Sequence, residues 1–263
     1  NRKFVQSLLW DNPYIDSSYE GSLQELDTAS KERLLMGNWD YSADPSSLMS
    51  AEGIEGIFEN SFVKITGKRY ITADIARLGS DKTVIRVWDG WRVLSRTVIS
   101  KERTTVTVQK IKDLQAKYQI PNARVLCDED GVGGGVVDVL SCKGFVANSR
   151  PFQHDPNNIN YDSLKSQCAW RLAKMVNSGQ VYENADVTTR ELLEEELEQI
   201  KQKNIDKDGK RSLQSKDLQK MVLGRSPDDA DTYIMRAWFD LAIVEGYTIV
   251  SSTEKKPTNT RRI

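Results

Sequence analysis

Three β-rich segments that follow one another closely are the feature that most constrains the fold of this chain. They occupy residues 69–75, 83–88 and 92–99, and only the short turn signals Gly-Ser-Asp at 79–81 and Asp-Gly at 89–90 separate them. Asp-Gly between two apolar runs is a strong signal for a β-hairpin. We therefore predict an antiparallel three-stranded meander.

The segments after the meander alternate between helix and strand. Apolar spacing predicts helices at 105–118, 136–140, 164–176, 189–200 and 227–244, and short β-rich runs predict strands at 124–127, 145–147 and 180–182. A second hairpin is expected at 204–213. This order predicts an α/β fold with a mixed sheet and helices on both faces. It argues against a doubly wound dinucleotide-binding fold, which opens with a βαβ unit.

Composition excludes several classes of protein. Of the 263 residues, 38% are hydrophobic and 29% are charged, so the chain can form a packed core. The three cysteines share no metal-ligand spacing and indicate a reducing compartment, and no apolar run is long enough for a membrane span. The single histidine, His154, excludes a histidine-based zinc motif, and we expect it on a surface loop.

The two ends of the chain differ in character from the part between them. Turn signals at 12–13 and 44–47 flank a short helical pattern at 22–36, and residues 249–263 are polar and basic, which is typical of a flexible tail. We expect a linker or extension over 1–55, a folded domain over 56–248 and a flexible tail over 249–263. Because the first residue is Asn1, we expect the chain to be a piece of a longer protein.

Carboxylates end two of the predicted strands. Asp74 follows the first strand of the meander, and Asp128 follows the strand at 124–127. If these strands are neighbours, the two carboxylates meet at one sheet edge, where such oxygen ligands suit a hard cation like Mg²⁺. A role in a turn or helix cap is the alternative for each aspartate alone. The glycines at 131–135 lack the pattern of a nucleotide-binding loop, and we expect them to permit close helix–strand packing beside Asp128.

A run of acidic residues opens the last predicted helix. In the segment Ser-Pro-Asp-Asp-Ala-Asp at 226–231, Ser226 suits the N-cap, and Asp229 suits the place of the Glu in a capping box. Asp228 and Asp231 are three residues apart, so they share a helix face. Asp231 has apolar neighbours in sequence, where a carboxylate needs a partner, and a cation is the simplest one.

One short stretch is basic although the net charge of the chain is −1. Residues 201–225 carry eight basic and three acidic side chains. Such a local positive excess indicates a surface that faces a polyanion, and a solvated face without a partner is the alternative.

Five segments carry a resemblance to a known family. They are YITADIA (70–76) with SDKT (80–83), CDEDGVG (127–133), SKD (215–217) and SPDDAD (226–231). In this order and spacing the chain resembles the nuclease domain of the terminase large subunit of tailed bacteriophages. Upstream, DNPY (11–14) and LLMGNWD (34–40) resemble the family's connection between its motor ATPase and its nuclease.

This resemblance implies a ribonuclease H-like fold and a metal-dependent DNA endonuclease that cuts concatemeric viral DNA during genome packaging in the host cytoplasm. It implies two Mg²⁺ or Mn²⁺ ions held by Asp74, Asp128 and Asp228, with Asp231 as a fourth metal-binding and catalytic acid. The implied partners are double-stranded DNA, an N-terminal ATPase domain of the same protein, the small terminase subunit and the portal protein. The chain itself has no Gly-x-x-x-x-Gly-Lys-Ser/Thr phosphate loop, so we expect no ATPase activity from it.

With this resemblance, the basic stretch becomes the expected DNA-binding surface. Phosphate contacts position DNA without reading its sequence, so we expect cleavage to be largely sequence-independent. Lys216 stands out because it lies in the Ser-Lys-Asp segment, although a solvated lysine would fit there equally well. The residues expected to contact the DNA backbone are Lys207, Lys210, Arg211, Lys216, Lys220 and Arg225.

Two other functions stay open at this point. A junction resolvase or a transposase has similar carboxylates, but the Gly-Asn-Trp segment at 37–39 argues against both. A non-catalytic docking module of a viral packaging assembly is the second alternative, and such a module would cut no DNA at any metal concentration.

Overall fold

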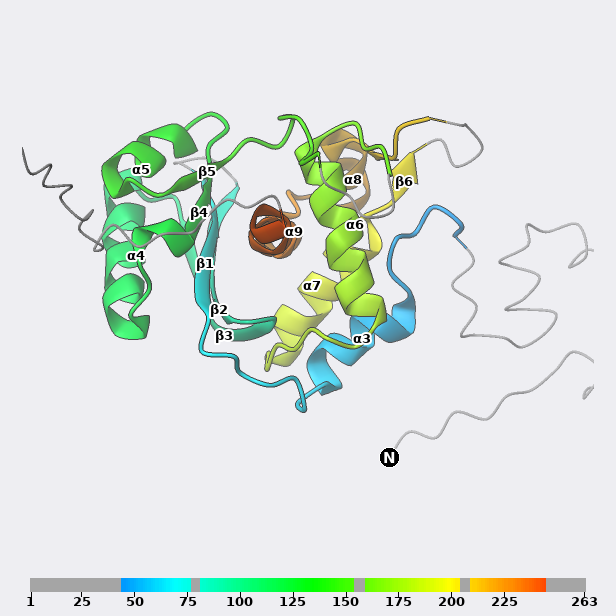
Figure 1. Cartoon of the computed structure of the whole chain (residues 1–263), viewed down its shortest axis with the longest axis horizontal. Coiled ribbons are helices and arrows are strands. Elements are labelled where there is room, and N and C mark those ends of the chain that lie inside the picture. The colour runs from blue at the N-terminus through cyan, green and yellow to red at the C-terminus, as the bar shows by residue number, and fades with distance from the viewer. Residues whose placement is uncertain (1–43, 77–80, 154–158, 204–208, 245–263) are drawn as a thin grey trace, which may run out of the picture.

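The structure, a computed structural model, describes residues 44–76, 81–153, 159–203 and 209–244. Its centre is a five-stranded sheet of order β3-β2-β1-β4-β5 (Figure 1). The neighbouring strands among β1, β2 and β3 pair antiparallel, whereas β1 with β4 and β4 with β5 pair parallel. The predicted meander and the predicted mixed sheet are therefore confirmed. The strands are β1 (Arg69–Asp74), β2 (Lys82–Asp89), β3 (Arg92–Ser100), β4 (Val125–Asp128) and β5 (Lys143–Phe145).

Helices cover both faces of the sheet, as expected. On one face lie α4 (Thr104–Tyr118) and α5 (Gly133–Leu140), and on the other lies α9 (Asp228–Val244). Behind α9 pack α6 (Leu164–Asn177), α7 (Val187–Glu198) and α3 (Ala51–Glu59). The strands β1 and β2 are buried almost throughout because both of their faces are covered. Within the described ranges, no helix has the length and apolar character to cross a membrane.

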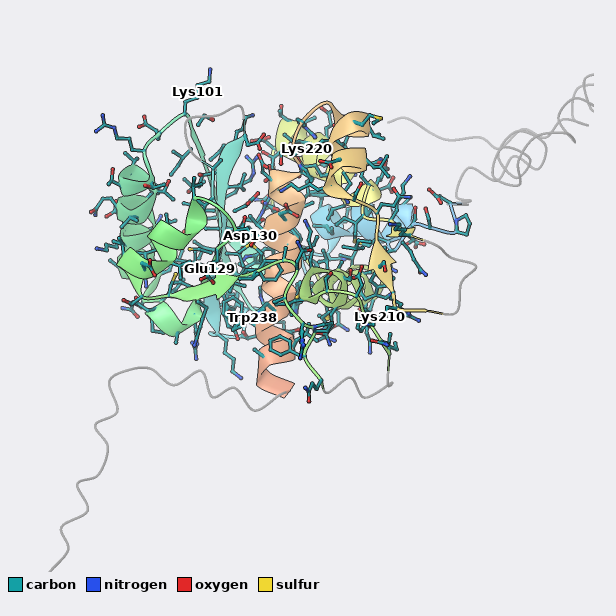
Figure 2. All side chains as sticks on the ribbon, turned by 90° about the horizontal axis from the view of Figure 1, so that it is seen from above. Lys101, Glu129, Asp130, Lys210, Lys220 and Trp238 are labelled. Carbon is teal, nitrogen blue, oxygen red and sulfur yellow. The ribbon has the colours of Figure 1, made fainter. Side chains whose placement is uncertain are left out.

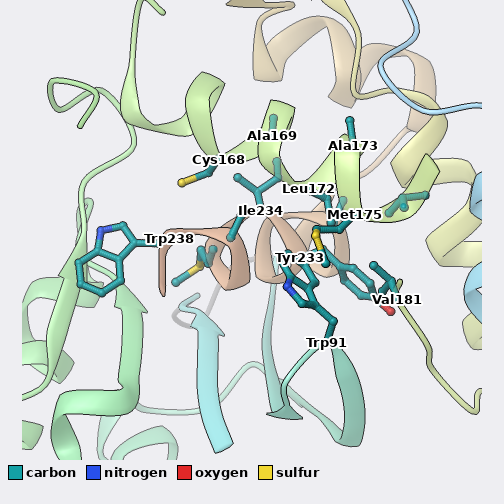
Figure 3. Close-up of a cluster of buried hydrophobic side chains, with 14 of the residues drawn as sticks. Trp91, Cys168, Ala169, Leu172, Ala173, Met175, Val181, Tyr233, Ile234 and Trp238 are labelled. Carbon is teal, nitrogen blue, oxygen red and sulfur yellow. The ribbon is translucent and has the colours of Figure 1, made fainter. Parts of the chain in front are cut away.

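The larger of two hydrophobic clusters joins α9 to α6. Figure 3 shows Cys168, Ala169 and Leu172 of α6 beside Tyr233 and Ile234 of α9. All five side chains are buried, and the small ones on α6 let the two helices approach closely. This packing holds α9 between the sheet and α6, and so fixes the position of the acidic residues at its N-terminus.

The register of β1 with β4 brings two aspartates to one edge of the sheet. Ala73 pairs with Cys127, and the next residues, Asp74 and Asp128, end the two strands. A Cβ atom at Gly133 would lie 1.7 Å from the backbone oxygen of Asp128. The close helix–strand packing expected of the glycine run is therefore confirmed at Gly133.

Several elements differ from the sequence-based prediction. β5 is shifted two residues towards the N-terminus, and the segment 180–182 forms only an isolated bridge, between Arg92 and Tyr182. The second hairpin has shorter strands than expected: β6 (Gln202–Lys203) pairs antiparallel with β7 (Ser212–Leu213), and residues 204–208 lie outside the described residues. An unpredicted helix, α8 (Lys216–Leu223), follows β7. Its apolar residues Leu218, Met221 and Val222 have the i, i+3, i+4 spacing of a helix face, so the sequence did carry a helical signal here, although the three side chains are exposed.

The folded core begins before residue 55, where the boundary of the N-terminal extension was expected. The helix α3 spans this boundary, and Met49, Ile54 and Ile57 are buried in the larger hydrophobic cluster. Other expectations fall on residues outside the described ranges: the helix at 22–36, the segments 11–14 and 34–40, His154, Lys207 and the tail at 249–263.

Candidate metal centre

Asp74 and Asp128 line a pocket of about 470 Å³ at the carboxyl ends of β1 and β4. Asp231 of α9 lines the same pocket, together with Lys216 at the start of α8. Asp74 is only 6% exposed because β1 is an inner strand of the sheet. The pocket therefore gathers three of the four expected metal-binding acids from three separate elements.

Asp228, the fourth expected acid, lies at the first position of α9 and is not part of the pocket lining. Its Oδ2 atom accepts a hydrogen bond of 3.0 Å from the backbone N–H of Lys82, at the start of β2. Asp228 is buried, with 8% of its surface exposed. The bond to Lys82 fixes this carboxylate between α9 and the meander.

Two lysines bind the carboxylate of Asp231. The Nζ atom of Lys165 donates to Oδ1 at 2.6 Å, and the Nζ atom of Lys216 donates to Oδ2 at 2.7 Å. Lys165 comes from the first turn of α6 and Lys216 is the first residue of α8. Each oxygen of Asp231 thus has its own ammonium partner.

The acids of the pocket differ in pKa because their neighbours differ. Burial raises the pKa of Asp74 well above its ordinary value, and the charges of Asp231, Asp228 and Asp128 raise it further. Burial likewise raises the pKa of Asp128 to about 6, and burial raises that of Asp228. Burial also disfavours the charge of Asp231, but its two lysines outweigh this effect and hold its pKa at about 2. The ionised forms of Asp74 and Asp128 are therefore unfavourable, while the two lysines stabilise the ionised form of Asp231.

Lys216 interacts electrostatically with several of these carboxylates. Burial alone would lower its pKa, but Asp231, Asp74 and Asp228 together raise it, so Lys216 stays charged. Its position in the pocket differs from that of a plain solvated lysine.

Asp229 contacts the sheet instead of the pocket. Arg96 of β3 donates to its two oxygens from Nε at 2.6 Å and Nη2 at 2.8 Å, and Nη2 of Arg86 lies 2.7 Å from Oδ1. Burial disfavours the charge of Asp229, but the attraction of Arg86 and Arg96 outweighs this effect and lowers the pKa of Asp229. The expected capping box does not describe these contacts: the carboxylate ties the start of α9 to β2 and β3.

Three further charged residues of the pocket were not among the expected site residues. Asp130, Asp162 and Lys165 all line it. Figure 2 shows Asp130 next to Glu129 on the β4–α5 side of the molecule. Two signals in the sequence pointed to Asp130 and Lys165. Asp130 lies in the CDEDGVG segment (127–133), and Lys165 lies in the first turn after the N-cap Ser163, where a basic side chain is unusual.

The donors in the pocket suit a hard divalent cation. Mg²⁺ and Mn²⁺ prefer carboxylate oxygens, and these are what Asp74, Asp128 and Asp231 present to the pocket. Within the part of the chain that the structure describes, no three acidic, histidine or cysteine side chains are already grouped as a metal site. Both oxygens of Asp231 are bound to lysines, so a metal on Asp231 requires a local rearrangement.

Solved structures share this arrangement of strands and helices. The nuclease domain of the large terminase subunit gp2 of bacterial virus Sf6 superimposes with a TM-score of 0.62 at 18% sequence identity, over 73% of this chain and 98% of that one. The fold is that of a terminase nuclease domain. It is a ribonuclease H-like fold, as the sequence resemblance implied. A point variant of the Sf6 domain gives a TM-score of 0.62 in its structure with manganese and β-thujaplicinol and 0.61 in its structure with calcium, with the same identity and coverage. No protein-family model matches the sequence, and no curated protein has significant similarity to it.

The basic residues expected to bind DNA occupy different places on this terminase nuclease fold. Lys210 is exposed near β7, and Lys220 of α8 pairs with Asp81 at 3.3 Å (Figure 2). Arg211 lies over the ring of Trp170 on α6, 5.7 Å from its centroid. Arg225 binds the backbone oxygen of Leu192 and the carboxylates of Glu195 and Glu196 on α7.

Proposed function

We propose that this chain is a metal-dependent DNA endonuclease that cuts concatemeric viral DNA during genome packaging. The observation that carries the proposal is the pocket where Asp74, Asp128 and Asp231 meet beside Lys216, at the carboxyl end of a terminase-type nuclease sheet. Structures of the Sf6 domain with manganese and with calcium support the use of a divalent cation. Phosphodiester hydrolysis is the reaction that such a carboxylate site performs without a protein nucleophile.

In this proposal, Asp74, Asp128, Asp228 and Asp231 hold two divalent ions, Mg²⁺ or Mn²⁺. When bound, the ions supply an activated water and stabilise the leaving oxygen of an in-line displacement. Lys82 orients Asp228 through its backbone N–H, and Lys216 orients Asp231.

DNA binding is assigned to the basic residues of the segment 201–225. Lys210, Arg211 and Lys220 contact the DNA backbone, with Lys207, Lys216 and Arg225 as further candidates. Such contacts give affinity without sequence specificity. The proposed packaging role places the protein in the host cytoplasm, where its further partners are an ATPase domain, the small terminase subunit and the portal protein.

Nicking of supercoiled plasmid in Mn²⁺ or Mg²⁺ tests the proposal. We expect the parental chain to nick, and Asp74→Asn and Asp128→Asn to lose this activity. Asp138→Asn is the matched control, because Asp138 is an exposed aspartate on α5. Chelation with EDTA should abolish nicking by the parental chain and by this control.

The same assay separates the alternatives. A docking module would cut no DNA at any metal concentration, so a complete lack of nicking by a folded parental chain would refute the proposal. A resolvase would cut four-way junctions in strong preference to plain duplex, whereas the proposed enzyme should cut both at similar rates.

A further inference from the structure

The carboxylate of Asp231 is held symmetrically by two helix starts. Ser163 caps α6 by accepting the N–H of Ser166, and Ser215 caps α8 by accepting the N–H of Leu218. Shortly after each serine comes the lysine that binds Asp231. Figures 1 and 2 show α6 and α8 on the side of α9 that faces away from the sheet, so the two ammonium groups reach the carboxylate from the same layer.

Helix stability does not account for a lysine in the first turn of α6. The N-terminus of a helix carries partial positive charge, so acidic side chains are favoured there and basic ones are disfavoured. The first turn of α6 has no acidic residue, and Lys165 is its second residue. The ammonium of Lys165 instead turns into the pocket, where its side chain is 19% exposed and donates to Asp231.

The backbone at Lys165 is anchored to the segment that follows β5. Its N–H donates to the backbone oxygen of Ala147, just after β5, at 3.1 Å. The base of the side chain is therefore fixed, while its long stem leaves the ammonium free to move by rotation about its own bonds. Such a side chain can release Asp231 without any movement of the helix.

We propose that Lys165 is a displaceable counter-ion, which binds Asp231 in the metal-free protein and yields that oxygen when a divalent cation enters the pocket. An ammonium and a divalent cation repel each other and cannot share one carboxylate oxygen. Lys216 keeps the second oxygen and so preserves the orientation of the carboxylate during the exchange. Lys165 therefore sets the metal concentration that the site requires. The inference rests on the proposed metal-dependent function.

Lys165 and Lys216 differ in where the sequence places them. Lys216 belongs to the Ser-Lys-Asp segment that carries the family resemblance, whereas Lys165 lies outside every such segment. The side chain of Lys216 is 39% exposed, about twice the value for Lys165. Lys165 is therefore the lysine assigned to displacement, and Lys216 the lysine that keeps Asp231 in place.

Titration of Mn²⁺ into the DNA-free protein tests the inference, with free Mn²⁺ followed by electron paramagnetic resonance. Lys165→Met should bind Mn²⁺ about ten-fold more tightly than the parental chain, because no ammonium then competes for Asp231. Lys165→Arg keeps the charge and should bind like the parental chain. Lys174→Met removes the same charge from an exposed position of the same helix and controls for the change in net charge.

Each outcome of this titration decides something different. Equal or weaker Mn²⁺ binding by Lys165→Met overturns the inference and leaves the proposed function standing. No Mn²⁺ binding by any folded chain overturns the proposed function and the inference together. An equal gain in Lys174→Met would show that net charge alone acts, and would also overturn the inference. If Lys165→Met does not fold, as judged by its melting curve in EDTA, Lys165→Gln takes its place with the same expectation.

Discussion

Asp229→Asn should destabilise the domain strongly, although the variant keeps nearly the same shape. The carboxylate of Asp229 is 4% exposed and faces Arg96 and the completely buried Arg86. Removal of one partner from a buried ion pair typically costs about 3–5 kcal/mol, because the other charge stays buried without compensation. For a domain of this size, that loss corresponds to a decrease in Tm of roughly 6–20 °C.

Thermal melting at pH 7 in EDTA measures this effect, and Asp228→Asn is the matched control one residue away. Burial raises the pKa of Asp228, so loss of its charge should leave Tm unchanged or raise it. The pH dependence gives a second check. Because the arginines lower the pKa of Asp229 despite its burial, its ion pairs stabilise the fold above the unfolded pKa of about 3.9 and lose this effect as pH falls through the folded value. The Tm values of the parental chain and Asp229→Asn should therefore converge below about pH 4.

A double-mutant cycle with Arg96→Met assigns the energy to the pair. The two single variants and the double variant should show a coupling of about 1–3 kcal/mol, since the residues touch. A loss of only about 1 kcal/mol in Asp229→Asn, with no coupling to Arg96, would refute the reasoning. It would mean that the residue acts only as a cap of its own helix.

Three further predictions concern the pocket and its surface. In EDTA, Asp74→Asn should raise Tm, because burial and the neighbouring carboxylates disfavour the ionised form of Asp74. Asp231→Asn should lower Tm, because two lysines lose their partner, and a Tm change of the same sign in both variants would contradict this reasoning. Gly133→Ala should destabilise the fold and stop nicking, because its Cβ would collide with the end of β4. Gly135→Ala has open space around it and should raise stability by up to about 1 kcal/mol. Similar melting curves for the two variants would exclude the collision. Lys210→Ala should reduce the slope of log binding constant against log salt by about 0.9, as one phosphate contact does, and an unchanged slope would remove Lys210 from the DNA-binding surface.

Local sequence signals predicted most of the fold. The meander could be read from alternating β-rich segments and an Asp-Gly turn, and its strands end within two residues of the expected positions. The parallel strand β4 and the helices α4, α6, α7 and α9 were also expected from short apolar patterns. These patterns depend only on residues that are close together in the chain, so they can be read from the sequence alone. The helix α8 was not predicted, although Ser215, Gly224 and the helical spacing of Leu218, Met221 and Val222 were readable from the sequence.

The sequence also showed which aspartates share a face of α9, but not which residues of other elements contact that face. The spacing of Asp228 and Asp231 was enough to separate them from Asp229. Only the packing of α9 against β2 and β3 decided that Asp229 meets two arginines and that Asp228 meets the backbone of Lys82. Such partners come from other elements, and helical spacing contains no information about them.

The sequence by itself determined that acidic residues end two strands and open the last helix of a ribonuclease H-like fold. Tertiary structure alone decided that two lysines stabilise the charge of Asp231, while burial disfavours the charges of Asp74 and Asp128. Lys165 lies 66 residues from Asp231 in the chain, and only the packing of α6 on α9 brings the two together. The electrostatics of this site depends on burial and on pairs between distant segments, and both exist only once the chain has folded.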